Sequence, residues 1–231
     1  RLAREIHIMS KVSHPNIISF TGFHLDRKDL RMACVIAPYM ANGNVGEYLD
    51  DNDSLLRHAA QLWDIATGVE YLHTYCPPIL HGDLKSPNVV VNEEGHAEII
   101  DFGTARFTEY ADDPLYAVRW ASPEMLLNSD VSLESDIWAL GWTFWEVVTG
   151  KIPHAEVTND MAVVVKTITE ASSKWADAND LQIQSLRDLL IDCWQKDPKR
   201  RPKASECRGA LRYMVRIKAS TFFILLMHFV S

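Results

Sequence analysis

The chain has 231 residues, of which 47% are hydrophobic, so it holds enough apolar material for one large domain or two small ones with a real core. It carries 23 Lys and Arg residues against 31 Asp and Glu residues, a net charge of -8, and it has no basic block that could follow a phosphate backbone. We therefore expect no nucleic-acid partner. The four cysteines are widely spaced and never form a C-x-x-C pair, which argues against a zinc site and against a disulfide framework. A reducing compartment, the cytosol or the nucleus, is expected, and of these two we predict the cytoplasm.

Neither end of the chain predicts a targeting or membrane segment. The opening RLAREIHIMSKV is charged and amphipathic, unlike a secretory signal. The apolar run TFFILLMHFV at 221–230 is far shorter than the roughly 20 residues of a membrane span. We therefore expect no membrane span, and we interpret the run as a packed or artefactual tail.

The first part of the chain combines a helix with two strands. Apolar residues recur at three- and four-residue intervals from Leu2, which predicts a helix to about Ser13, where His-Pro follows. The β-rich runs 16–25 and 30–40 flank the charged turn DRKD and predict an antiparallel hairpin. ANGN at 41–44 breaks this pattern and is expected to be a linker.

The rest of the chain is expected to be mainly helical. From Ser54 a helical face of apolar residues runs for about five turns until Pro77-Pro78. The run SDIWALGWTFWEVVTG is apolar nearly all round, as a buried helix requires, and Gly150 is its expected stop. Further helices are predicted near 159–171, 181–195 and 204–217. A small β-rich part and a larger helical part would leave a cleft between them, where ligands commonly bind.

Acidic and amide side chains surround two short strands in the middle of the chain. HGDLKSPN at 81–88 precedes a valine run, and a turn and a second strand then lead to Asp101-Phe102-Gly103. This arrangement is expected to bring Asp83, Asn88 and Asp101 towards one another. Such oxygen ligands suit magnesium, which prefers to share its coordination shell with substrate phosphates, so the site indicates a nucleoside triphosphate.

These motifs, with SPE, DIWALG and DPKRRP following in order, resemble the signature set of the protein kinase family over about residues 1 to 216. The resemblance implies an α+β, two-lobe fold with a truncated β-rich N-lobe and a mainly helical C-lobe. The partial N-lobe would cover residues 1–40, the C-lobe 41–216 and an apolar tail 217–231.

The resemblance also implies the roles of the central residues. Asp83 matches the aspartate that accepts the substrate hydroxyl proton, and Lys85 the lysine that stabilises the transferring phosphoryl group. Asn88 and Asp101 match the two magnesium ligands. The chain would thus use ATP and Mg²⁺ to phosphorylate a protein substrate, because phosphoryl transfer needs mainly positioning and charge neutralisation.

Nucleotide contacts are implied on the hinge and on the first helix. Ala37 matches the gatekeeper, the amide of Met40 would donate a hydrogen bond to adenine, and the carbonyl of Pro38 would accept one. Glu5 matches the helix glutamate that pairs with a strand lysine.

Three further residues are similar to structural residues of the family. Glu124 in SPE would form an ion pair with Arg201. Asp136 would hold the catalytic loop from beneath.

The chain departs from the family pattern at three places. The Gly-rich loop and the strand lysine should precede Glu5, yet the sequence starts at Arg1, so this chain alone is expected to be unstable or inactive. Gly82 replaces the arginine of H-R-D, which would remove the usual cation for a phosphorylated activation loop. Ala117 replaces a threonine that bridges the catalytic aspartate and lysine, which would weaken turnover. Because Gly82 leaves no arginine to bind a phosphorylated activation loop, phosphorylation of the loop would not switch the enzyme by this route. The candidate hydroxyls are those of Thr104, Thr108, Tyr110 and Tyr116.

Lys85 and the RWASPE stretch resemble the tyrosine-kinase-like branch, with serine/threonine specificity. Two alternatives stay open. The chain could be an inactive pseudokinase or scaffold module, or a fragment of a larger kinase.

Overall fold

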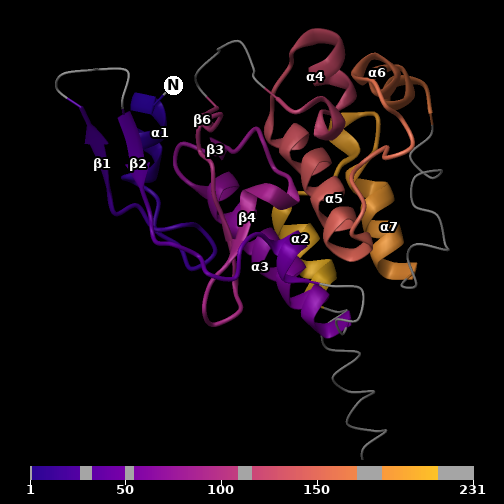
Figure 1. Cartoon of the computed structure of the whole chain (residues 1–231). Coiled ribbons are helices and arrows are strands. Elements are labelled where there is room, and N and C mark those ends of the chain that lie inside the picture. The colour runs from indigo at the N-terminus through magenta and orange to yellow at the C-terminus, as the bar shows by residue number, and fades with distance from the viewer. Residues whose placement is uncertain (1, 27–32, 50–54, 109–115, 171–183, 213–231) are drawn as a thin grey trace, which may run out of the picture.

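The computed structural model describes residues 2–26, 33–49, 55–108, 116–170 and 184–212. A small part with one helix and a two-stranded sheet stands beside a larger, mostly helical part (Figure 1). The predicted turn DRKD, apart from Asp26, and the apolar tail lie outside the described residues. The expected division into a small strand-rich part and a helical remainder is therefore what the structure shows.

The small part consists of α1 (Leu2–Met9), β1 (Gly22–Leu25) and β2 (Ala33–Ile36). The strands are antiparallel, with Gly22 opposite Ile36, as predicted, although both are shorter than the apolar runs. The prediction that the first helix continues to about Ser13 was wrong, because it ends at Met9. There the Ser10 hydroxyl donates to the carbonyl of His7, and the amides of Lys11 and Val12 both donate to the carbonyl of Ile8, which closes the helix in a tight turn.

The expected linker at 41–44 is a turn that starts a short helix, α2 (Val45–Tyr48). The Asn44 side chain accepts hydrogen bonds from the amides of Gly46 and Glu47, and the Glu47 side chain accepts one from the amide of Asn44. This capping box explains why a helix starts directly after the turn.

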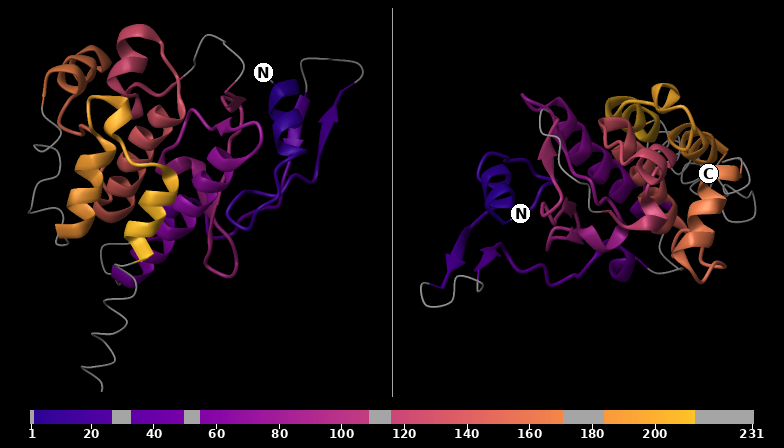
Figure 2. Two further views of the ribbon diagram at one scale, coloured as in Figure 1. Left: turned by 180° about the vertical axis from the view of Figure 1, so that it is seen from behind. Right: turned by 90° about the horizontal axis from the view of Figure 1, so that it is seen from above.

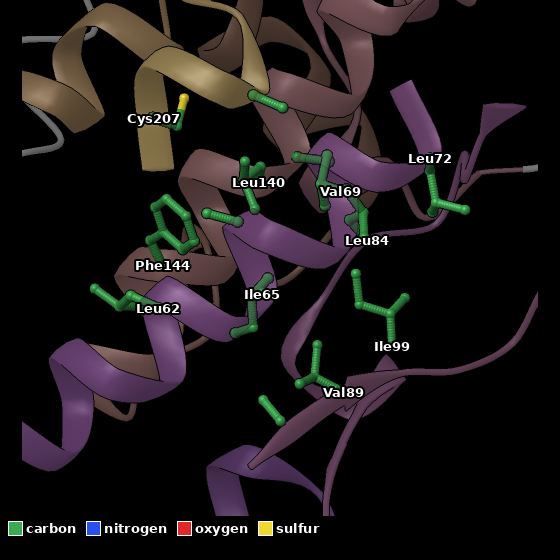
Figure 3. Close-up of a cluster of buried hydrophobic side chains, with 14 of the residues drawn as sticks. Leu62, Ile65, Val69, Leu72, Leu84, Val89, Ile99, Leu140, Phe144 and Cys207 are labelled. Carbon is green, nitrogen blue, oxygen red and sulfur yellow. The ribbon is translucent and has the colours of Figure 1, made fainter. Parts of the chain in front are cut away.

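Helix α3 (Leu55–Thr74) is the predicted helix that ends before the two prolines. One of its faces packs on α5 (Leu133–Thr149), and it also contacts the hairpin of β4 (Val89–Val91) and β5 (Ala97–Ile99). Figure 3 shows this core, in which apolar side chains of α3, of the hairpin and of α5 meet. A third antiparallel pair, β3 (Ile79–Leu80) with β6 (Arg106–Phe107), was not predicted.

Helix α5 (Leu133–Thr149) is buried along most of its length, as its apolar sequence predicts. Trp138 and Phe144 are fully buried. The helix ends at Gly150, whose φ of 65° favours glycine, and this confirms the predicted stop. The strand β3 and the 3-10 turn Ser86–Asn88 lie against this helix.

The remaining helices surround α5 and were predicted except for the shortest (Figure 2). α6 (Asp160–Thr169) and α7 (Gln184–Cys193) match the predictions, α4 (Pro123–Asn128) was missed, and residues 204–212 are helical. The four cysteines are free thiols. Among the helices that the structure describes, none combines the length and the apolar character needed to cross a membrane.

Candidate active site

The loop after β3 holds the Asp83 carboxylate in a fixed orientation. The Lys85 ammonium lies 2.6 Å from Asp83 Oδ2, and the Asn88 amide nitrogen donates to the same oxygen at 2.9 Å. Asn88 also donates to the Asp83 carbonyl at 2.8 Å. Neither side-chain contact uses Asp83 Oδ1, and the Asp83 side chain is 12% exposed. The Asp83 carboxylate is thus partly accessible, and its Oδ2 is held by Lys85 and Asn88.

Asn88 and Asp101 lie at adjacent positions of the β4–β5 hairpin. The amide of Ile100, next to Asp101, donates to the Asn88 carbonyl at 3.0 Å. Asn88 uses its Nδ2 for Asp83, so its Oδ1 faces away from that contact, and Asp101 is exposed with Oδ1 accepting from the amide of Gly103. The predicted approach is therefore observed for Asp83 and Asn88, while Asp101 follows the residue that pairs with Asn88.

The two oxygen donors suit a magnesium ion that completes its shell with phosphate and water. Within the described ranges, no group of three or more His, Cys, Asp or Glu side chains could hold a metal ion by itself. Asn88 and Asp101 fit the role of a partial ligand set.

Asp136 lies under the first half of the loop and is 1% exposed. Its carboxylate accepts hydrogen bonds from the amides of His81 (2.8 Å) and Gly82 (2.9 Å) and contacts the His73 imidazole at 3.1 Å. Burial raises the pKa of Asp136, but the hydrogen bond and charge of His73, with the contribution of His81, outweigh burial and leave the pKa below its ordinary value. The expected support from beneath is thus observed, while the contribution of His73 was not foreseen.

Glu146 lies under the second half of the loop and was missed by the sequence reasoning. Its Oε2 accepts hydrogen bonds from the amide of Ser86 at 3.0 Å and from the Trp120 indole at 2.8 Å. Burial raises the pKa of Glu146 to about 7, against the hydrogen bonds from Ser86 and Trp120 and the charge of Lys85. A glutamate inside an otherwise apolar helix was the sequence signal that could have identified it.

The ion pair expected between Glu124 and Arg201 is present. Arg201 donates to both carboxylate oxygens, at 2.6 and 2.8 Å, and its side chain is fully buried. Arg201 also donates to the carbonyl of Glu134 at the start of α5. This bidentate pair joins α4 to the base of the helical part.

The other predicted nucleotide residues lie at the edge of the helical part and in the small part. Ala37 and Pro38 are exposed in the connection after β2, and Met40 is half-buried against the core. Glu5 is half-buried on α1, which contacts β2. The nucleotide-binding roles of these four residues stay predictions.

The two substituted motif positions lie on one cavity beside Asp83. Gly82 and Ala117 both line it, together with Tyr116 and Trp120. Gly82 has a φ of 80°, a left-handed conformation that glycine adopts without strain.

The activation-loop candidates have different environments. Thr104 is buried, and its hydroxyl donates to the carbonyl of His81. Thr108 is exposed, and the Tyr116 hydroxyl donates to the Met125 carbonyl at 3.3 Å. Tyr110 lies outside the described residues.

A small strand-containing part beside a helical part, with an acidic loop held on a buried helix, is the architecture of a protein kinase domain. The chain belongs to the family described as protein tyrosine and serine/threonine kinase, whose model matches residues 1–211. The resemblance deduced from the motifs is thereby confirmed.

The similar proteins include two proteins named as serine/threonine-protein kinases and one named as a receptor. The chain is 31% identical over 222 residues to a probable serine/threonine-protein kinase, pats1, of Dictyostelium discoideum, covering 90% of this chain and 7% of the relative. It is 30% identical over 212 residues to the serine/threonine-protein kinase TNNI3K of Rattus norvegicus, covering 88% and 25%. It is 31% identical over 229 residues to ephrin type-A receptor 5 of Gallus gallus, covering 94% and 22%. The chain thus spans a quarter or less of the length of these relatives.

Proposed function

We propose that this kinase domain, within its full-length protein, transfers the γ-phosphate of ATP to serine or threonine hydroxyls of a protein substrate. The observation that carries this proposal is the Asp83 carboxylate, which is oriented through Oδ2 by Lys85 and Asn88. Its Oδ1 would accept the proton of the substrate hydroxyl. An aspartate held in this way suffices as the base, because positioning and charge stabilisation dominate phosphoryl transfer.

Lys85 and the ligand pair would divide the neutralisation of phosphate charge. Lys85 carries its charge beside Asp83, where it would stabilise the phosphoryl group during transfer. Asn88 Oδ1 and Asp101 would hold Mg²⁺, which supplies charge neutralisation on the phosphate oxygens when bound. Met40 and Pro38 would contact the adenine beside Ala37. Glu5 would pair with a strand lysine, as the resemblance implies.

Serine/threonine specificity and a cytoplasmic location are the finer parts of the proposal. Lys85 supports the first, since a lysine at this place resembles serine/threonine and tyrosine-kinase-like kinases. The free cysteines support a reducing compartment.

The test is a phosphotransfer assay on the full-length protein with γ-labelled ATP and Mg²⁺, followed by phosphoamino-acid analysis. Asp83→Asn should lower kcat by about 100-fold or more, because it removes the proton acceptor but keeps the side-chain shape. Glu93→Gln, an equivalent change at an exposed position, should retain activity. Full activity in Asp83→Asn would overturn the proposed base. An inactive wild type would favour the pseudokinase or scaffold alternative, which is based on the departures from the family pattern at Gly82 and Ala117.

A further inference from the structure

Two buried cysteine thiols lie in contact within the core of the helical part. Cys193 is the last residue of α7, and Cys207 belongs to the helix 204–212 (Figure 3). Their sulfur atoms are 3.9 Å apart, and both residues are fully buried. The other two cysteines, Cys34 and Cys76, are exposed. The proposed phosphotransfer uses neither thiol of the buried pair.

Cys193 is the fixed member of the pair. α7 packs on α5 so closely that a Cβ added at Gly141 would lie 2.8 Å from the Cβ of Cys193. The next residue, Trp194, is fully buried, and the centre of its ring lies 4.2 Å from that of Trp142 on α5. Because side chains in a packed core interdigitate with few voids, these contacts leave Cys193 little freedom to move.

Cys207 lies on a helix that packs on the core along one narrow stripe. The buried residues of the helix 204–212 recur at three- and four-residue intervals and are Ala204, Cys207 and Leu211. Arg208 adds a partly exposed ion pair with Glu70 of α3, and such pairs contribute little to stability. A helix held by so few contacts opens at a lower free-energy cost than global unfolding. We therefore expect Cys207 to become accessible when this helix opens.

The closed arrangement protects the two thiols from oxidation. The hydrogen bond with Cys207, and then burial, raise the pKa of the Cys193 thiol well above its ordinary value. The thiolate is the nucleophile in thiol chemistry, so a thiol that stays protonated and buried reacts slowly. The opening of the helix 204–212 should therefore limit the rate at which the pair is oxidised.

We propose that Cys193 and Cys207 form a reversible modification site, at which a peroxide joins the helix 204–212 to α7 through a disulfide bond. The sulfur atoms start about 1.9 Å farther apart than in a disulfide, whose S–S distance is about 2.05 Å, and the outer helix is the element that moves to close this gap. The cysteines are free in the structure, so the disulfide is an added state of the protein and no part of its framework. The inference does not depend on the proposed phosphotransfer.

The reaction balances with hydrogen peroxide as the oxidant. The Cys207 thiolate attacks a peroxide oxygen, so that an S–O bond forms, the O–O bond breaks, and the released hydroxide takes up a proton to become water. The Cys193 thiolate then attacks the sulfenic acid, so that the S–S bond forms, the S–O bond breaks, and a second water leaves. The two thiols together lose two electrons, and one peroxide is reduced to two waters.

The chemical test is a peptide map of the full-length protein after treatment with hydrogen peroxide and alkylation of the remaining thiols. Trypsin releases the two cysteines on separate peptides, 188–196 and 204–208, because a lysine or an arginine precedes and ends each of them. We expect the two peptides to be joined, and dithiothreitol to separate them. A urea concentration too low to unfold the protein should speed the joining, since it favours opening of the helix. Unlinked peptides, or joining at a rate that urea does not change, would overturn the proposal.

Amide hydrogen exchange tests whether the disulfide holds the outer helix in place. Because the two cysteines are 14 positions apart, the link should slow exchange in residues 205–212 by about 100-fold. Peroxide should not slow this exchange in Cys207→Ala, whereas Cys34→Ser, a change at an exposed cysteine, should behave as the wild type.

Two outcomes of the exchange measurement contradict the proposal. Equal exchange in the joined and the reduced wild type would show that the disulfide does not restrain the helix. The same slowing by peroxide in Cys207→Ala would show that another oxidation causes it. If Cys207→Ala does not fold, the wild type compared before and after dithiothreitol still decides the question.

Discussion

Helix α5 presents two buried carboxylates to the two halves of one loop, and the pKa values of the two groups are shifted from their ordinary values in opposite directions. Asp136 supports the amides of His81 and Gly82, and Glu146 supports the amide of Ser86. Both are almost inaccessible, at 1% and 4% exposure. Yet the pKa of Asp136 is lowered, while burial raises the pKa of Glu146 to about 7.

The difference shows that the donors of a buried carboxylate decide its charge more than its depth does. Asp136 uses both oxygens and has His73 as a chargeable partner. Glu146 is hydrogen-bonded by the neutral groups of Ser86 and Trp120, so the cost of burying its charge is less fully offset. One half of the loop thus rests on a carboxylate that stays ionised at neutral pH, and the other on one that titrates there.

Removing the Asp136 carboxylate should have the largest effect on stability. Asp136→Ala leaves the amides of His81 and Gly82 buried without their acceptor, so the free energy of unfolding should fall by roughly 3 to 5 kcal/mol. Urea denaturation at neutral pH measures this change. Glu134→Ala, an exposed acidic residue in the same helical turn, is the control and should change stability by no more than about 0.5 kcal/mol. Similar losses in the two variants would contradict the role of Asp136.

Glu146 should make the free energy of unfolding depend on pH. The pKa is raised from 4.5 to about 7, so the stability that the protonated group contributes is fully present below 4.5 and is lost as pH rises through about 7. The wild type should therefore lose up to roughly 3 kcal/mol more than Glu146→Gln between pH 4.5 and pH 8.5. The pH dependence of denaturant unfolding, compared between the two proteins, measures it. Parallel curves would show that Glu146 does not titrate in this range.

Asp136 should act in the opposite sense. Its lowered pKa contributes stability above the ordinary value of 3.8, and this stability is lost as pH falls through the folded pKa. Because that window lies below the Glu146 window, the two contributions can be separated in one series.

The smallest expected effect is at Gly82, whose amide binds Asp136. An added Cβ would lie 3.4 Å from the carbonyl of Thr104, and the φ of 80° disfavours other residues. Gly82→Ala should cost about 1 kcal/mol, measured by the shift of the urea midpoint. Gly209→Ala, in the helix 204–212 with open space at its Cβ, should not destabilise. A stabilised Gly82→Ala protein would contradict the strain.

Periodicity predicted the elements whose burial dictates their sequence. α3 and α5 were predicted because an apolar face or an apolar run is required wherever a helix lies in the core. The end of α1 was mispredicted, because local hydrogen bonds of Ser10 and Lys11 close the helix before the proline acts. The β3–β6 pair was missed because two-residue strands leave no alternation to detect.

The site was predictable where its residues are close together in the sequence. Asp83, Lys85 and Asn88 occupy one motif, and the structure brings them into contact. The bridge from Glu146 to Trp120 was not predictable, since the residues lie 26 positions apart and share no motif. Such a contact depends on how α5 packs against the loop, which a single sequence does not encode in a local pattern.

The most direct measurement is a carboxyl ¹³C NMR titration of the wild type, with Asp136 and Glu146 assigned through their amide variants. The Asp136 carboxyl should titrate below 3.8 and the Glu146 carboxyl at about 7. That result would confirm that one helix holds the catalytic loop with a permanently charged and a titrating carboxylate. Titration of both groups near their ordinary values, or in the reverse order, would contradict it.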